Sequence, residues 1–286
     1  MSSHAASAEP GAFARRLSLP RVAAEPLATV AFGAVLAAIA LEGGGGLQLG
    51  PLTKVEMAVD VVAGALVAAA IVVGGYTRRM WGGLTLALMA ALVVVTALSI
   101  SWAVEPSAAW QEANRTLSYL ATMAGGVALA RLFPRRWTAL LGGIVLASVV
   151  VCGYALLTKV FPGALNADEK YARLREPYGY WNAVGLTAAM GVPLCLWLGT
   201  RDDGRRPSSI AAYPLLALFF VGMLLSFSRG SILAATVGVA LWLAIVPLRL
   251  RSLALLATST VAAAAVTAWA FSQSALTDDR IGLADR

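Results

Sequence analysis

Long runs without a charged residue recur along the sequence, and short charged clusters separate them. Several runs reach the roughly 20 residues that a helix rising about 1.5 Å per residue needs to cross the hydrocarbon core of a bilayer. Inside that core every backbone polar group must find its partner within the protein, so the runs predict transmembrane helices. The chain is 59% hydrophobic and only 13% charged, which excludes an ordinary soluble domain.

The runs predict an all-α, polytopic transmembrane helical bundle of about nine spans. The clearest spans are Met80–Val104, Trp137–Thr158, Tyr178–Thr200, Pro207–Ser228, Gly230–Leu248 and Ser252–Thr277. Three further runs are short, and they are Pro26–Leu41, Val61–Tyr76 and Thr116–Ala130. These short runs can cross only by recruiting flanking residues, such as Gly43–Leu49 or Glu112–Arg115.

The first 25 residues form a different kind of segment. Residues 1–25 are rich in Ala and Ser and lack the apolar core of a signal peptide, so we predict a disordered cytoplasmic tail. Residues 26–286 then form the transmembrane helical domain. Cys152 and Cys195 both lie inside apolar runs, and two isolated cysteines are expected to pack as small hydrophobes rather than to bind a metal.

The arginines indicate the orientation in the membrane. With about nine spans, the side of the N-terminus holds Arg15, Arg16, Arg21, Arg78, Arg79, Arg131, Arg135, Arg136, Arg201, Arg205, Arg206, Arg249 and Arg251. Because cytoplasmic loops carry the excess of Lys and Arg, we predict a cytoplasmic N-terminus and a multi-pass protein of the inner (plasma) membrane. The net charge of +7 does not indicate nucleic-acid binding, because the basic residues are scattered in pairs.

Three polar blocks lie on the predicted exterior side. They are Ser101–Pro106 with Ala109-Trp110 and Asn114-Arg115, then Arg173-Leu174 with Pro177 and Gly179-Tyr180-Trp181-Asn182, and then Leu224–Ser231, which contains Ser228-Arg229-Gly230. In this order the blocks resemble the signature motifs of the O-antigen ligase and O-antigen polymerase superfamily in its actinobacterial form. The resemblance covers roughly Ser101–Ser231.

The resemblance implies a glycosyltransferase of the cell envelope. Such an enzyme takes a glycan from an undecaprenyl-pyrophosphate carrier at the outer leaflet, with membrane lipid around it and with no metal, cofactor or nucleic acid. Arg173 and Arg229 are then substrate-binding candidates, because a guanidinium pairs bidentately with phosphate and stays charged beside lipid. The structural alternative is an arginine that only extends to the lipid headgroups, and for Arg175 we favour a solvated side chain.

The aromatic and amide residues after Gly179 are the other substrate-binding candidates. Asn182 either caps the following helix or bonds a sugar hydroxyl, and we favour the cap. Tyr180 and Trp181 either stack on a sugar or belong to the aromatic belt at the membrane surface.

The sequence departs from the family at the general base. Family members carry a large exterior domain late in the chain, with a histidine as the proposed base, whereas the single histidine here is His4 in the predicted cytoplasmic tail. We therefore assign no catalytic residue and expect the chain to be the N-terminal part of a longer protein that binds the carrier without turnover. Asp168, Glu169 and Glu176 are the exterior carboxylates that remain as candidate bases.

Two other classes of function stay open. A transporter or flippase-like protein would need charged residues in the middle of its spans and often has inverted repeats; the span centres are nearly free of charge and no clear repeat is present. A non-catalytic scaffold would use small residues such as Gly125-Gly126 and Gly142-Gly143 for close packing, but every helical bundle does so. The glycan, the acceptor, the choice between ligation and polymerisation and the oligomeric state do not follow from the sequence.

Overall fold

A computed structural model of the chain describes residues 21–44, 49–74, 82–134, 136–165, 173–200, 207–247 and 249–273. The regular structure within these ranges is helical. It consists of α1 (Arg21–Glu42), α2 (Leu49–Gly74), α3 (Gly83–Ser99), α4 (Pro106–Leu132), α5 (Trp137–Val160), α6 (Pro162–Leu165), α7 (Trp181–Thr200), α8 (Pro207–Leu225), α9 (Arg229–Ile245) and α10 (Arg249–Phe271). The prediction of an all-α membrane protein is confirmed at this level, since six of the described helices, α1, α2, α5, α7, α8 and α10, are long and apolar enough to cross a bilayer.

The other helices are too short or too polar to count among these six. Helices α3 and α9 are apolar but have 17 residues each, which gives a length of about 25 Å, slightly less than the hydrocarbon core. Helix α4 has 27 residues, but its first half carries Glu112, Asn114 and Arg115. Helix α6 has four residues and follows the end of α5.

Several helices begin earlier than the uncharged runs predict. Helix α1 begins at Arg21, inside the segment predicted to be a disordered tail; residues 1–20 lie outside the described ranges. Helix α2 begins at Leu49 rather than at Val61, and α4 begins at Pro106 rather than at Thr116. Polar residues thus extend the short runs, and in α1 and α2 the extension gives the length that a bilayer span needs.

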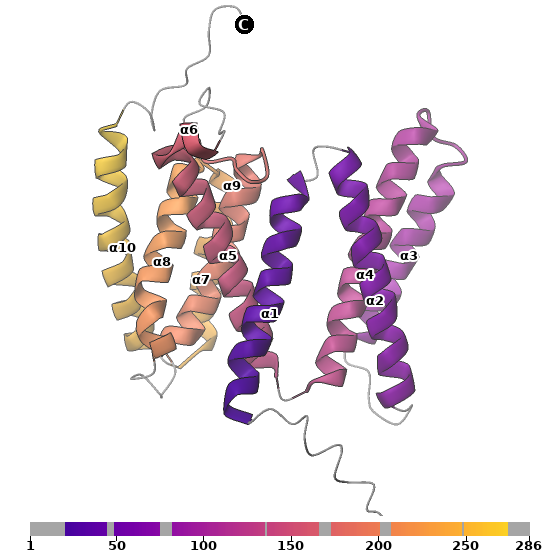
Figure 1. Ribbon diagram of the computed structural model, residues 1–286, viewed down its shortest axis with the longest axis horizontal. Coiled ribbons are helices and arrows are strands. Elements are labelled where there is room, and N and C mark those ends of the chain that lie inside the picture. The colour runs from indigo at the N-terminus through magenta and orange to yellow at the C-terminus, as the bar shows by residue number, and fades with distance from the viewer. Residues whose placement is uncertain are drawn as a thin grey trace, which may run out of the picture.

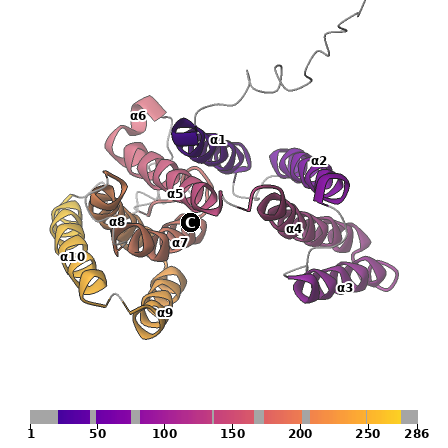
Figure 2. The same cartoon turned by 90° about the horizontal axis from the view of Figure 1, so that it is seen from below.

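The described helices form two groups that lie side by side (Figures 1 and 2). Helices α2, α3 and α4 pack together in one group, with α4 between the other two. In the second group α7 is central and contacts α5, α8, α9 and α10, while α1 packs along α5. Among the described residues, the main helix contact between the groups is that of α1 with α2.

The two ends of the bundle have different side chains. One end, which we call the motif end, holds the ends of α1, α8 and α10 and the beginnings of α2, α4, α7 and α9 (Figure 1). The opposite end holds the described arginines Arg131, Arg136, Arg249 and Arg251, whereas the motif end holds four other described arginines together with Glu105, Glu112 and Glu176. At the opposite end the ring centroids of Trp137 and Trp197 lie 5.3 Å apart, which joins α5 to α7.

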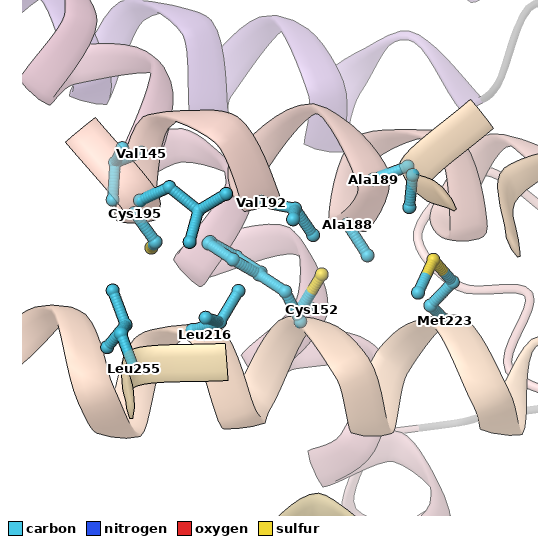
Figure 3. Packing of buried hydrophobic residues seen from close by; sticks show 12 residues of the cluster. Val145, Cys152, Ala188, Ala189, Val192, Cys195, Leu216, Met223 and Leu255 are labelled. Atoms are coloured by element: carbon cyan, nitrogen blue, oxygen red, sulfur yellow. The ribbon is translucent and has the colours of Figure 1, made fainter. Parts of the chain in front are cut away.

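The core of the second group surrounds α7 (Figure 3). Val192 and Cys195 of α7 are fully buried against Leu216 of α8, and Cys152 of α5 is buried in the same cluster. Both cysteines are free thiols in apolar surroundings, so they pack as the small hydrophobes that we predicted.

Glycines lie where helices approach each other most closely. A Cβ added at Gly143 of α5 would lie 2.6 Å from the Phe32 ring of α1, and one at Gly125 of α4 would lie 3.1 Å from the Cβ of Ala63 on α2. Gly126, by contrast, has nothing within 4 Å of such an atom. Close packing at Gly125 therefore stabilises the first group, and close packing at Gly143 stabilises the second.

We expect Gly191→Ala to lower the stability of the bundle. The added Cβ would lie 2.3 Å from the Phe219 ring, which is itself fully buried and has no room to move. Overpacking of this kind costs about 1–3 kcal/mol. The thermal unfolding midpoint of the detergent-solubilised protein measures the effect, with Gly153→Ala as the matched control because its Cβ would meet nothing within 4 Å. Equal midpoints for the two variants would contradict the packing of α7 against α8.

Candidate functional site

The Arg173-Leu174 segment is fixed to the end of α8. The Leu174 backbone N–H donates a 3.1 Å hydrogen bond to the carbonyl of Leu225. The Leu174 side chain is fully buried and packs with Val184 of α7 and Ala263 of α10. This anchor places Arg173 beside the turn that joins α8 to α9.

The residues that lead into α7 form a closed loop. The Tyr180 N–H donates to the carbonyl of Arg175 at 3.1 Å, and Gly179 adopts the left-handed conformation with φ 66° that the loop requires. The Tyr178 hydroxyl lies 3.2 Å from the hydroxyl of Thr187. Burial raises the pKa of Tyr178 above its ordinary value, so the phenol stays neutral over the physiological range. Tyr178 and Leu174 are thus two anchors on either side of Arg175.

Arg173 lies between two aromatic rings. Its guanidinium carbon is 4.9 Å from the centroid of the Trp181 ring and 5.9 Å from that of Phe227. A guanidinium attracted to ring faces in this way still presents its N–H edge to a ligand. Arg173 therefore connects two blocks that are distant in the sequence: its own block, which includes Trp181, and the α8–α9 turn, which includes Phe227.

The Ser226–Ser231 block forms that turn and the first turn of α9. Ser228 is the N-cap, since its hydroxyl accepts a 3.3 Å hydrogen bond from the N–H of Ser231, and the Ser231 hydroxyl donates to the Ser228 carbonyl at 2.8 Å. The turn packs directly on α7, because a Cβ added at Gly185 would lie 2.7 Å from the hydroxyls of both Ser226 and Ser231. Arg229 therefore becomes the first residue of α9.

Phe227 and Arg229 have unusual positions in this turn. Phe227 has φ 53°, a left-handed conformation that costs a residue with a Cβ about 1–2 kcal/mol, and its ring lies 5.8 Å from that of Phe271. Arg229 is exposed and adds its positive charge to the positive end of the α9 dipole. An anion bound at this end would offset both charges.

A pocket of about 600 Å³ lies below the motif end, between α1, α2, α4 and Tyr180. We call it the α2–α4 pocket. Its polar lining consists of Glu56, Arg115, Ser118, Tyr119, Thr122 and Tyr180. Arg115 Nη1 donates a 2.7 Å hydrogen bond to Glu112 Oε1, one turn earlier on α4.

Tyr180 connects the α2–α4 pocket with the loop before α7. The Asn182 amide nitrogen donates a 2.5 Å hydrogen bond to the Tyr180 hydroxyl and so fixes the ring that lines the pocket. Asn182 is the second residue of α7, and Tyr180 is the residue whose carbonyl accepts the first helical bonds, from Ala183 and Val184. The favoured interpretation of Asn182 as the cap is therefore wrong, because the helix begins one residue earlier.

The structure thus brings the three predicted blocks to one end of the bundle. Arg115 and Tyr180 line the same pocket, and Arg173 lies over Phe227. Arg175 differs from the solvated residue that we expected, since its side chain is only 22% exposed and lies 3.5 Å from the Glu176 carboxylate. His4, Asp168 and Glu169 lie outside the described residues.

Two acidic residues of α2 were not among the predicted site residues. Glu56 and Asp60 lie within the candidate span Leu49–Val73, one helical turn apart. They precede the uncharged run, which begins only at Val61, and so were not included in the predicted span. A usable signal was Pro51, since proline in the first turn of a helix is typical of an early start.

No family model, curated protein or solved structure matches the chain. Among the residues that the structure describes, no group of three or more His, Cys, Asp or Glu side chains is placed to hold a metal ion.

We expect Phe227→Gly to be more stable than Phe227→Ala, by about 1 kcal/mol. Both variants lose the ring that contacts Arg173 and Phe271, but only glycine also relieves the left-handed backbone. Thermal or denaturant unfolding of the purified protein measures the difference. At most helix and loop positions alanine gives the more stable protein. If the alanine variant is also the more stable one here, the turn does not have the left-handed conformation at residue 227.

Proposed function

We propose that the chain is the membrane domain of an O-antigen-ligase-like glycosyltransferase that binds an undecaprenyl-pyrophosphate-linked glycan at the outer leaflet of the plasma membrane. One observation carries the proposal: blocks spread over Ser101–Ser231 in the sequence meet at one end of the bundle, through Leu174 on Leu225, Arg173 over Phe227 and the pocket shared by Arg115 and Tyr180. A shared site is what the resemblance requires of these blocks.

The chemistry of the arginines supports the proposal. In glycosyl transfer from such a carrier, an acceptor oxygen attacks the anomeric carbon and the bond to the pyrophosphate oxygen breaks, so negative charge grows on the pyrophosphate. Arg173 and Arg229 supply fixed positive charge at the motif end, and Arg173 is oriented by Trp181. Charge placed in advance of the reaction stabilises the leaving group without further reorganisation.

The proposed topology has nine spans, with the motif end outside the cell. It is supported by the nine described helices other than α6 and by the full sequence, in which 13 of the 22 Lys and Arg residues fall on the side of the N-terminus, since cytoplasmic loops carry the basic excess. Helices α3 and α9 would cross with their ends near the headgroups, and α4 would direct its polar half toward α2 rather than toward lipid.

Cysteine labelling tests this orientation. We expect Val104→Cys, at a fully exposed position of the motif end, to react with a membrane-impermeant thiol reagent on intact cells, and Pro134→Cys at the other end to react only after lysis. The two native cysteines are buried and give little background. The reverse pattern would place the N-terminus outside.

Carrier binding tests the arginines. We expect Arg173→Ala and Arg229→Ala each to weaken binding of an undecaprenyl-pyrophosphate-linked sugar in nanodiscs by about tenfold or more, because each removes charge-assisted bonds to phosphate. Arg251→Ala, an exposed arginine at the opposite end, is the matched control and should bind as before. If neither Arg173→Ala nor Arg229→Ala changes the affinity for the carrier, the proposal is wrong.

A second candidate, a transporter or flippase-like protein, is favoured by one observation. Asp60 lies in the candidate span Leu49–Val73, and its Oδ1 atom is buried with no hydrogen-bond partner among the described residues. Ionisable residues inside a membrane often carry protons or ions. Proteoliposomes that contain a pH-sensitive dye test this function: substrate-dependent proton uptake that Asp60→Asn abolishes would favour a transporter over a transferase.

A further inference from the structure

We infer that the α2–α4 pocket binds a neutral sugar ring, next to the pyrophosphate position at Arg173. The inference rests on the proposed function, because a transferase must hold a sugar beside the phosphate that leaves it. The chemistry of the pocket nevertheless points to a sugar by itself, and binding can be measured without transfer.

The size and lining of the pocket fit a small polyhydroxylated ligand. Its volume of about 600 Å³ falls within the range of roughly 300–1,000 Å³ of ligand sites. The Glu56 carboxylate accepts hydrogen bonds, the Arg115 guanidinium donates them, and four hydroxyl groups from Ser118, Tyr119, Thr122 and Tyr180 can do either. A sugar presents several hydroxyls that are donors and acceptors at once, so it can use such a mixed lining.

Ser118 gives an independent indication of a missing ligand. Its side chain is only 7% exposed, its hydroxyl has no hydrogen-bond partner among the described residues, and it lines the pocket. Buried polar atoms are almost always paired, since an unpaired one loses its bonds to water without replacement. A ligand hydroxyl in the pocket would supply the partner.

The charges of the pocket select against other ligands. The lining brings together one carboxylate, Glu56, and one guanidinium, Arg115, and Glu112 pairs with Arg115 from outside the lining. A lipid acyl chain would leave these charged groups without water or partners. A neutral ligand with many hydroxyls can bond to both groups and adds no charge of its own.

The pocket also adjoins the residues that hold Arg173. Tyr180 lines the pocket, and the next residue, Trp181, supports the guanidinium of Arg173. Consecutive residues therefore border the proposed sugar and phosphate positions. The tilted contact of the Tyr180 and Trp181 rings, with centroids 5.6 Å apart, holds the two positions in a fixed relation.

Binding of free methyl glycosides tests the inference. Titrate the full chain in nanodiscs with methyl α-D-glucopyranoside, methyl α-D-mannopyranoside, methyl α-D-galactopyranoside and methyl N-acetyl-β-D-glucosaminide, and follow heat or ligand-observed NMR. We expect saturable binding of at least one glycoside, weakened about tenfold by Glu56→Gln. Glu105→Gln, at an exposed position just before α4 and outside the pocket lining, is the charge-matched control.

Ser118→Ala keeps the test valid if Glu56→Gln impairs folding. The Ser118 hydroxyl has no hydrogen-bond partner within the part of the chain that the structure describes, so its removal should leave the thermal midpoint unchanged while it weakens glycoside binding about fivefold. Ser107→Ala, an exposed serine on the same helix, should change neither quantity. No saturable binding of any glycoside, or binding that both pocket variants leave intact, would overturn the inference.

A second arm separates this inference from the proposed function and a free sugar from a carrier-linked one. Arg173→Ala should weaken binding of the undecaprenyl-pyrophosphate-linked sugar and leave the free glycoside unaffected, whereas Glu56→Gln should weaken both. Glycoside binding in the pocket without any carrier binding would support the sugar site and refute the transferase. Carrier binding that needs Arg173 but not Glu56 would support the transferase and refute the sugar site.

Discussion

The arrangement of the second helix group depends on how closely its neighbours approach α7. Lipid tails are as apolar as leucine, so helices in a bilayer gain little from hydrophobic burial and associate by close van der Waals contact instead. Glycines on α7 allow that contact on several sides: Gly185 against the serines of the α8–α9 turn, Gly191 under the ring of Phe219, and Gly199 against Leu255 of α10. Larger side chains at these positions would separate the helices that carry the motif residues.

The motif end follows from this packing. Because Gly185 admits the serine turn, the turn lies on the first part of α7, and Phe227 in its left-handed conformation reaches Arg173. Leu174 fastens the same loop to α8. Arg173 and a mixed, hydroxyl-rich pocket at Glu56 and Arg115 thus adjoin the neighbouring residues Trp181 and Tyr180, although these residues are distant in the sequence.

The sequence was sufficient for the fold class, because long uncharged runs have few other stable structures. It also pointed to Arg173 and Tyr180, which do lie at one end of the bundle. It failed at α2, where counting uncharged residues stopped at Asp60, although helix packing allows ionisable groups in a span when they face other helices. Which face Glu56 occupies depends on α4, and the contact of Arg173 with Phe227 joins residues distant in the chain. Neither relation leaves a local trace in the sequence.

The separation into two helix groups has a mechanical consequence. Their main helix contact is that of α1 with α2, whereas the lining of the α2–α4 pocket comes from both groups, with Tyr180 and Ile39 on one side and Glu56 and Arg115 on the other. A molecule in the pocket is therefore a cross-link between two bodies that otherwise touch little. By thermodynamic linkage, its binding free energy and the tendency of the groups to stay together must reinforce each other. Occupancy of the pocket would then set the stiffness of the whole membrane domain.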